Sequence, residues 1–355
     1  MSAVVLPAVA EGACSLDRLR LYRFRNYAEQ SVDLGPRLNL IGGRNAQGKT
    51  NLLEAVATLL LTRSPRAAVA GDVVRWHCDE ALVEATVRRP AADRTLAVRF
   101  RRDPESGRVS RTASVDGSPR PARELLGLCP VVLFWPEDLQ LVKAGPDGRR
   151  RLLDVVLSQL DARAATDLVR YRHILEQRNS LLRQVRAGSA NAAELPGFTT
   201  ELVACGARIQ VMRAELVREL APHAAEVLGQ ISGGDEVLDL RYIPDGGMVA
   251  TDDRVAAERA LLATLARRRE EEVQRGVTLA GPHRDDLELL IDGRPARSAG
   301  SQGQQRSIVL AVKLAEVRHI ARRAGVMPVL LLDDVLSELD PGRRRDLLAG
   351  LAAAG

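Results

Sequence analysis

Residues 43–50 spell GRNAQGKT, which matches the phosphate-loop pattern G-x-x-x-x-G-K-[ST] at every fixed position. The backbone N–H groups of such a loop wrap the phosphates of a nucleotide, helped by the positive end of the helix that follows. Lys49 is placed to reach the β- and γ-phosphate oxygens, and the Thr50 hydroxyl is placed to bind Mg²⁺. Lysine is rare in this chain, which has only Lys49, Lys143 and Lys313, so an accidental Gly-rich turn is a poor alternative. The predicted nucleotide-binding residues are Gly43, Arg44, Asn45, Ala46, Gln47, Gly48, Lys49, Thr50 and Asn51.

Residues 329–334, VLLLDD, put two carboxylates at the end of an apolar run. The four apolar residues predict a buried strand, and open α/β sheets bind ligands beyond the carboxyl ends of such strands. Asp333 is placed to hold Mg²⁺, and Asp334 to orient or deprotonate an attacking water. A carboxylate pair capping a loop would explain this segment alone, but the phosphate loop elsewhere in the chain favours the metal site.

A second Gly-rich segment, SQGQQ, occupies residues 301–305. Ser301 and Gly303 just ahead of a helix present a hydroxyl and bare N–H groups to an anion. An ordinary helix N-cap uses the same residue types and would be the simpler interpretation of this segment taken alone.

Several elements are predicted to position these segments. Residues 16–25 alternate apolar and basic, which predicts a half-exposed strand. Residues 37–41 predict a short strand that runs into the phosphate loop, and residues 50–61 have helical spacing. Residues 81–115 alternate in stretches separated by turns, which predicts an antiparallel meander.

The middle of the chain is predicted to be helical. Residues 149–185 predict one long helix without Pro or Gly, and residues 200–228 predict a second, with a possible kink at Pro222. Helices joined by a short loop fold back as an antiparallel hairpin. The remaining predictions are strands at 236–243 and 287–292, helices at 254–274 and 304–324, and a last helix opened by Asp340 and Pro341.

Composition narrows the class of protein. The 355 residues are 46% hydrophobic and 27% charged, which suits two or three globular units, and no apolar run approaches the length of a membrane span. Four scattered cysteines without a CxxC pair favour free thiols in a reducing cytosol, so we expect a cytoplasmic protein without a membrane partner.

Charge bears on nucleic-acid binding. A net charge of +5 is compatible with it, and since aromatic residues are only 3%, contacts are expected to run through arginine to duplex phosphates. Solvated faces are the alternative for each of the arginine candidates, which are Arg18, Arg20, Arg99, Arg101 and residues 149–151.

The order of phosphate loop, Ser-x-Gly-Gln, acidic strand and SELD (residues 337–340) resembles that of ABC-type ATPases. In that family the signature residues contact the γ-phosphate bound by the other subunit, which implies that Ser301, Gly303 and Gln304 act in trans. Further motifs narrow the resemblance to the RecF family, whose members have an ABC/SMC-like head. These motifs are FRNY (24–27), FWPEDLQLVKAGPDGRRRLLD (134–154), GPHRDDL (281–287), SQGQQR (301–306) and LLLDDVLSELD (330–340).

The resemblance spans the chain from about Leu16 onward and implies an α/β head with a helical second lobe, a short helical hairpin and no long coiled coil. It implies an ATP- and Mg²⁺-dependent homodimer that binds duplex DNA at gap junctions and helps RecO and RecR load RecA. Arg25, in FRNY, would contact the nucleotide; an exposed strand-end charge is the alternative. Asp334 stands where most ABC ATPases have Glu, which implies slow hydrolysis. The domain expectation is a tail at 1–15, an ATPase lobe at 16–125 and 232–355, and a helical lobe at 126–231.

Three other classes share parts of this pattern. A transporter ATPase subunit would need a membrane partner, and would lack the helical hairpin. An SMC-type structural head would need a coiled coil of hundreds of residues. A metabolic kinase is excluded mainly by SQGQQ and SELD.

Overall fold

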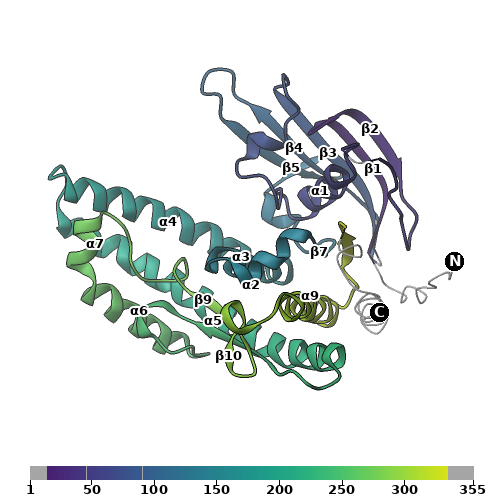
Figure 1. The fold of residues 1–355 in the computed structure, drawn as a ribbon. Helices are drawn as coiled ribbons and strands as arrows, with labels where there is room; N and C mark the ends of the chain where they lie inside the picture. Colours follow the sequence, from purple (N-terminus) through teal and green to yellow (C-terminus); the bar gives the residue numbers. More distant parts are fainter. Residues whose placement is uncertain (1–13, 45, 90, 335–355) are drawn as a thin grey trace. The chain divides into compact units, whose positions relative to one another are not determined.

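The computed structural model describes residues 14–44, 46–89 and 91–334 (Figure 1). The chain divides into two compact units, one running up to Asp138 and resuming at Glu316, the other from Leu139 to Ala315. Residues 1–13 of the tail predicted at 1–15, Asn45, SELD and the helix predicted at Asp340 lie outside the described residues, while Ser15 already begins the first strand.

The first unit is built on an antiparallel sheet with strand order β2-β1-β3-β4-β5-β6. Its inward side chains, such as Leu19, Val83 and Val98, are fully buried, because strand alternation sends every second residue to the core. The predicted strand at 16–25 and the meander at 81–115 are confirmed. The strands are β1 Ser15–Phe24, β2 Tyr27–Asp33, β3 Glu80–Arg88, β4 Arg94–Arg102, β5 Val109–Val115 and β6 Ser118–Arg120.

Helix α1 (Lys49–Leu60) joins this sheet to a second, two-stranded one. It contacts β1, β3 and β4 on one side and the parallel strands β7 (Val131–Phe134) and β11 (Val329–Leu332) on another. The buried side chains of Leu52, Val56 and Leu59 form its packing face. The start of α1 therefore lies where the residues after β7 and β11 can reach it.

The strand predicted at 37–41 is wrong: these residues pair with no strand among those described, and Leu40 is 88% exposed. The physical reason lies in Asn39, whose side-chain amide donates to the Gly35 carbonyl at 2.9 Å and accepts from the Gly35 N–H at 2.7 Å. A side chain that satisfies both backbone groups of Gly35 closes a local turn in place of a sheet ladder.

The second unit contains the helical hairpin. The single helix predicted over 149–185 is instead two, α3 (Pro146–Leu160) and α4 (Ala162–Arg186), because Asp161 adopts an extended backbone and caps α4 by accepting from the Arg163 N–H at 2.7 Å. Helix α5 (Leu195–Ser232) runs through Pro222 without ending. At 1.5 Å per residue, α4 and α5 are roughly 38 and 57 Å long, far shorter than a coiled coil of hundreds of residues.

Contacts between α4 and α5 show that they are antiparallel. Asp167 pairs with Arg208, and Arg178 bonds to Thr199, so positions advance on one helix as they recede on the other. A buried cluster that includes Ile174, Leu202 and Leu261 closes the hairpin against α6 (Arg254–Arg267).

A three-stranded sheet, β10-β9-β8, packs on this hairpin unit through α3 and α5. For that reason residues 232–315, which the sequence grouped with the phosphate-loop lobe, belong to the compact unit of the hairpin up to Ala315. The predicted helix at 254–274 is divided at Arg268. The elements are α2 Gln140–Lys143, β8 Leu238–Ile243, α6 Arg254–Arg267, α7 Arg269–Arg275, β9 Asp286–Ile291, β10 Arg294–Pro295, α8 Ala296–Ala299 and α9 Gln302–Ala324.

In the described part of the chain, no helix combines the length and the apolar character that a bilayer span requires. Cys14, Cys78, Cys129 and Cys205 are all free thiols.

Candidate nucleotide-binding site

The phosphate loop turns sharply into α1. Gly48 has a φ of 102°, and a Cβ there would lie 2.6 Å from the Asn26 amide, so only glycine allows this approach. The Lys49 ammonium donates to the carbonyls of Gly43 at 2.7 Å and Arg44 at 2.9 Å, which holds its charge over the loop. The site therefore offers a lysine and a helix N-terminus to an anion.

The FRNY turn (residues 24–27) fastens the loop to the antiparallel sheet. The Asn26 amide donates to the Gln47 carbonyl at 3.2 Å and accepts from the Asn51 amide at 2.9 Å. The Tyr27 hydroxyl donates to the Gly48 carbonyl at 3.2 Å. Sequence reasoning missed Asn26 and Tyr27 as supports, although they stand inside a motif that it had singled out.

The predicted metal ligands, Thr50 in the first turn of α1 and Asp333 just after β11, meet within the first unit. The Thr50 hydroxyl donates to a carboxylate oxygen of Asp333 at 3.2 Å. Asp333 is fixed because its N–H bonds to the Phe134 carbonyl at 3.0 Å, continuing the β11–β7 pairing. Mg²⁺ prefers oxygen ligands and commonly takes few from the protein, so one hydroxyl and one carboxylate side by side fit it.

Asp334 follows directly, exposed and with a φ of 54°. This left-handed backbone turns the chain sharply after β11, so the two neighbouring carboxylates do not continue the strand alternation. The role predicted for Asp334, orienting water, stays a prediction.

Arg25 is held by a fully buried acid. Its guanidinium donates to both carboxylate oxygens of Glu54, at 2.6 to 3.2 Å, and to the Asp72 carbonyl at 2.6 Å. Glu54 also accepts from the Ser64 hydroxyl at 2.6 Å and from Arg66 at 3.3 Å. The nucleotide contact predicted for Arg25 stays a prediction. In the structure Arg25 is bonded to Glu54 of α1, the helix whose N-terminus is the candidate phosphate site.

Glu54 was missed by sequence reasoning. The available signal was a lone acid on the apolar face of the helix pattern in residues 50–61. A buried carboxylate requires charged partners, so such an acid indicates arginines brought from elsewhere in the chain.

Ser301, Gly303 and Gln304 belong to the second unit. The Ser301 hydroxyl accepts from the Gln304 N–H at 3.2 Å, while the Gln304 side chain accepts from the Ser301 N–H at 2.8 Å. This reciprocal pair is a capping box that starts α9. The simple N-cap interpretation therefore describes the local geometry, and contact with a partner's nucleotide stays a prediction.

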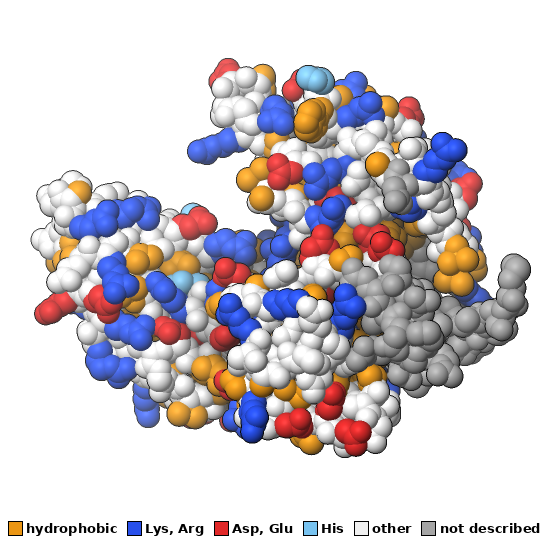
Figure 2. All heavy atoms as spheres, in the orientation of Figure 1, with side chains coloured by type: hydrophobic (Ala, Val, Ile, Leu, Met, Phe, Trp, Pro, Cys, Tyr) orange, Lys and Arg blue, Asp and Glu red, His pale blue; other side chains and the backbone are white. Residues whose placement is uncertain are grey.

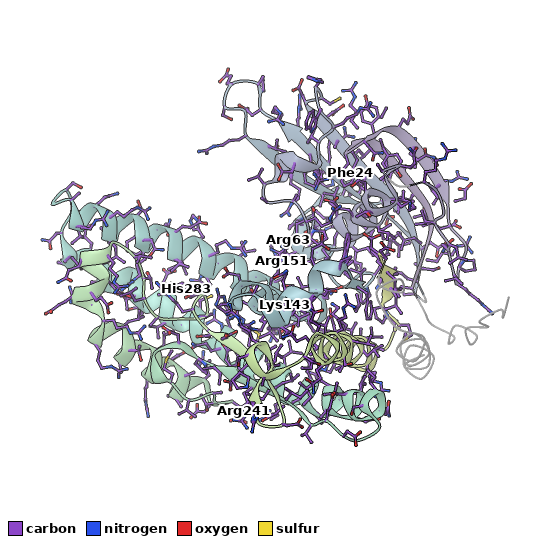
Figure 3. All side chains as sticks on the ribbon, viewed as in Figure 1. Phe24, Arg63, Lys143, Arg151, Arg241 and His283 are labelled. Carbon is purple, nitrogen blue, oxygen red and sulfur yellow. The ribbon has the colours of Figure 1, made fainter. Side chains whose placement is uncertain are left out.

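The GPHRDDL segment lies in the second unit, where Asp285 and Leu287 are buried and Arg284 is exposed (His283 is labelled in Figure 3). His283 Nε2 faces the Thr278 carbonyl at 3.1 Å, so it carries the proton, and Nδ1 accepts from the Tyr171 hydroxyl at 2.7 Å. Burial lowers the pKa of His283 to about 4, which keeps the ring neutral. A Cβ at Gly281 would collide with the Tyr171 hydroxyl.

Asp285 of the same segment is buried. It accepts from the Tyr242 hydroxyl, from the Gln210 amide at 3.1 Å and from the Asp245 N–H at 2.9 Å. Burial raises the pKa of Asp285. The charged turn of the sequence is thus a polar joint that ties β8, β9 and α5 together.

The arginines proposed for DNA contact differ in their surroundings. Arg18 pairs with Asp33, Arg20 with Glu84 and Arg99 with Glu80. Over the part of the first unit that Figure 2 shows, blue basic side chains are interspersed with red acidic ones. Such a face attracts phosphates less than a purely basic one.

The remaining candidates separate further. Arg101 is exposed and makes no ion pair with any described residue. Arg149 is buried and bonds to Asp286 through two nitrogens, at 2.7 and 2.9 Å, so it is a structural residue of the second unit. Arg150 donates to the Asp285 carbonyl at 2.7 Å, while Arg151 is exposed.

Comparison with known proteins agrees with this architecture. A family model described as an AAA domain matches residues 18–114. The chain is 41% identical over 342 residues to the DNA replication and repair protein RecF of Moorella thermoacetica, covering 96% of this chain and 88% of that protein. It is 37% identical to the RecF of Geobacillus kaustophilus, covering 94% and 88%.

Among solved structures, the recombination mediator protein RecF with ATP, of the RecFOR pathway, superposes with a TM-score of 0.88 at 32% identity. The match covers 96% of this chain and 90% of that one. The phosphate loop, the acidic strand and the likeness along nearly the full length point the same way: this chain belongs to the RecF family.

Proposed function

We propose that this chain is an ATP-dependent, dimerising DNA-binding protein of recombinational repair. It binds duplex DNA at single-strand gaps and, with RecO and RecR, helps to load RecA. Family membership supports this proposal, since the relatives are described as DNA replication and repair proteins and one solved relative as a recombination mediator of the RecFOR pathway.

The observation that carries the ATPase part is the contact of Thr50 with Asp333 at 3.2 Å, beside Lys49 over the phosphate loop. Lys49 would neutralise charge on the β- and γ-phosphates, and the Thr50 and Asp333 oxygens would hold Mg²⁺, which would screen the charge that develops in phosphoryl transfer. Asp334 orients the attacking water. Because its side chain is one carbon shorter than that of Glu, hydrolysis is slow and serves as a switch.

For the dimer, we propose that Ser301, Gly303 and Gln304 contact the γ-phosphate of the nucleotide bound by the partner subunit. A capping box leaves further N–H groups at the start of α9 for an anion. The four free thiols support a reducing compartment, and we propose the cytoplasm.

The alternative functions fit less well. An SMC-like structural head needs far longer helices than α4 and α5 provide. A transporter subunit has no use for the hairpin unit that spans Leu139–Ala315.

The proposal is tested by analytical ultracentrifugation with Mg²⁺ and ATP, in the presence and absence of duplex and gapped DNA. We expect dimers with ATP and monomers without it, and tighter binding of the gapped duplex than of the intact one. Equal dimerisation with and without ATP would refute the proposal that ATP switches the protein between monomer and dimer. Absence of DNA binding under all conditions would refute the repair role.

A further inference from the structure

Trp76 is the most unusual surface residue of the first unit. The chain has two tryptophans, and while Trp135 is 7% exposed, Trp76 is 86% exposed. An indole carries a large apolar surface, and leaving it in water is unfavourable. In a chain with only 3% aromatic residues, so exposed an indole is a candidate for stacking against a ligand.

Trp76 borders a surface hollow of about 540 Å³. The hollow is formed by the segment before β3 and by Arg102 at the end of β4, and includes no residue of the phosphate loop or of α1. Its lining is polar around the indole: Arg75, His77, Asp79 and Arg102 contribute, and Val74 is 4% exposed. An apolar peptide anchor would find little matching surface here.

The basic groups are arranged to hold a phosphate beside the ring. Arg75 and Arg102 line the hollow, whereas Arg101, the residue before Arg102 in β4, is exposed but does not line it. Of the two acids in the lining, Asp72 is already engaged, since its carboxylate accepts from the N–H groups of Ala68 and Val69 at 3.1 Å, while Asp79 is exposed. A flat ring with polar edges and an attached phosphate fits these groups.

The hollow is also connected to the phosphate loop. The Arg75 N–H donates to the Arg23 carbonyl at 2.8 Å, and the Arg75 guanidinium donates to the Asn26 carbonyl at 2.5 Å. Asn26 in turn bonds to Gln47 at 3.2 Å. Hydrogen bonds through Asn26 thus link the segment that carries Trp76 to the phosphate loop.

We propose that Trp76 is a stacking platform for one unpaired base of single-stranded DNA. A base stacks on the indole, and Arg102, which lines the hollow, contacts its phosphate. This inference rests on the proposed DNA-binding function and adds what that function lacks, which is a group that distinguishes a gap from an intact duplex. Stacking accepts any base, since every base has a π-face.

Intrinsic fluorescence tests this directly, because Trp76 is the exposed one of two tryptophans. The chain is titrated, with Mg²⁺ and a non-hydrolysable ATP analogue, with oligothymidylate of roughly 15 nucleotides, with a gapped duplex and with a blunt duplex. We expect quenching by the first two and not by the blunt duplex. The control Trp76→Phe should lose the signal and keep the affinity.

Binding of the same DNAs by anisotropy gives the second readout. Trp76→Ala should weaken binding of oligothymidylate and gapped duplex about tenfold, with blunt duplex and ATP binding within about twofold. Equal weakening for all DNAs, or no weakening for any, would overturn the proposal. Quenching by ATP alone would show that the hollow binds the adenine of the nucleotide. Quenching by RecR without DNA would show that it binds a protein partner. Either result would overturn the proposal. If wild-type protein binds no DNA at all, the proposed function itself fails.

Discussion

The Thr50 hydroxyl and the Asp333 carboxylate lie 3.2 Å apart although 283 positions separate them in the chain. One begins α1 and the other ends β11, and the contact of α1 with the β7–β11 pair brings them together. We expect Asp333→Asn to weaken Mg²⁺-dependent binding of ATP at least tenfold, because an amide replaces a charged oxygen ligand. Isothermal titration calorimetry with and without Mg²⁺ measures this. Equal affinity in the two proteins with Mg²⁺ present would contradict the assignment.

Lys49 provides the second prediction. Lys49→Met removes the cation held over the loop, so nucleotide-dependent dimerisation should be lost. Sedimentation with ATP measures it, and Lys143→Met in α2 is the matched control because it removes a lysine outside the loop. Unchanged dimerisation of Lys49→Met would show that the loop does not bind the nucleotide that drives assembly.

A third prediction concerns Ser301. Ser301→Arg should leave ATP binding by the monomer within about twofold, since residues 43–50 are untouched, but should prevent dimerisation by filling the partner's γ-phosphate position. Mixing it with Lys49→Met pairs one intact loop with one intact signature and should restore part of the ATPase activity. Loss of ATP binding in the Ser301→Arg monomer would place the segment in its own chain's site.

DNA binding gives a fourth prediction. If arginines contact phosphates without reading bases, affinity should fall steeply with salt and vary little with sequence. Arg101→Ala should reduce the slope of log K against log salt by about one, whereas Arg18→Ala should change it little, because Asp33 already pairs with Arg18. Equal effects of the two changes would show that the ion pairs on the sheet do not decide which arginines bind DNA.

The fifth prediction follows from His283. Its pKa is about 4 in the folded chain and about 6.5 when unfolded, so the unfolded state binds more protons between these values and stability falls as pH drops. From pH 7.5 to 5, wild type should lose about 2 kcal/mol more than His283→Gln. The raised pKa of Asp285 acts in the opposite direction but is present in both proteins. Denaturant unfolding at the two pH values measures the difference, and parallel losses would refute the neutral, half-buried ring.

Much of this protein could be predicted where the deciding physics is local. GRNAQGKT specifies a phosphate loop because spacing, glycine and lysine act within eight residues. Strand alternation at 16–25 and 81–115 predicted the antiparallel sheet, since one residue in two must face a core. The order of motifs along the chain was enough to indicate the family.

The tertiary structure decided what depends on distant surfaces. Helical periodicity continues through Asp161, yet the helix ends there and a new one begins. The apolar run at 37–41 forms a turn because the Asn39 side chain bonds to both backbone groups of Gly35. No pattern along the chain predicts that Glu54 gathers Arg25, Ser64 and Arg66. Sequence alone determined which residues could do chemistry. Which of them meet depends on how elements far apart in sequence pack together. The same packing buries Trp135 and leaves Trp76 exposed to water.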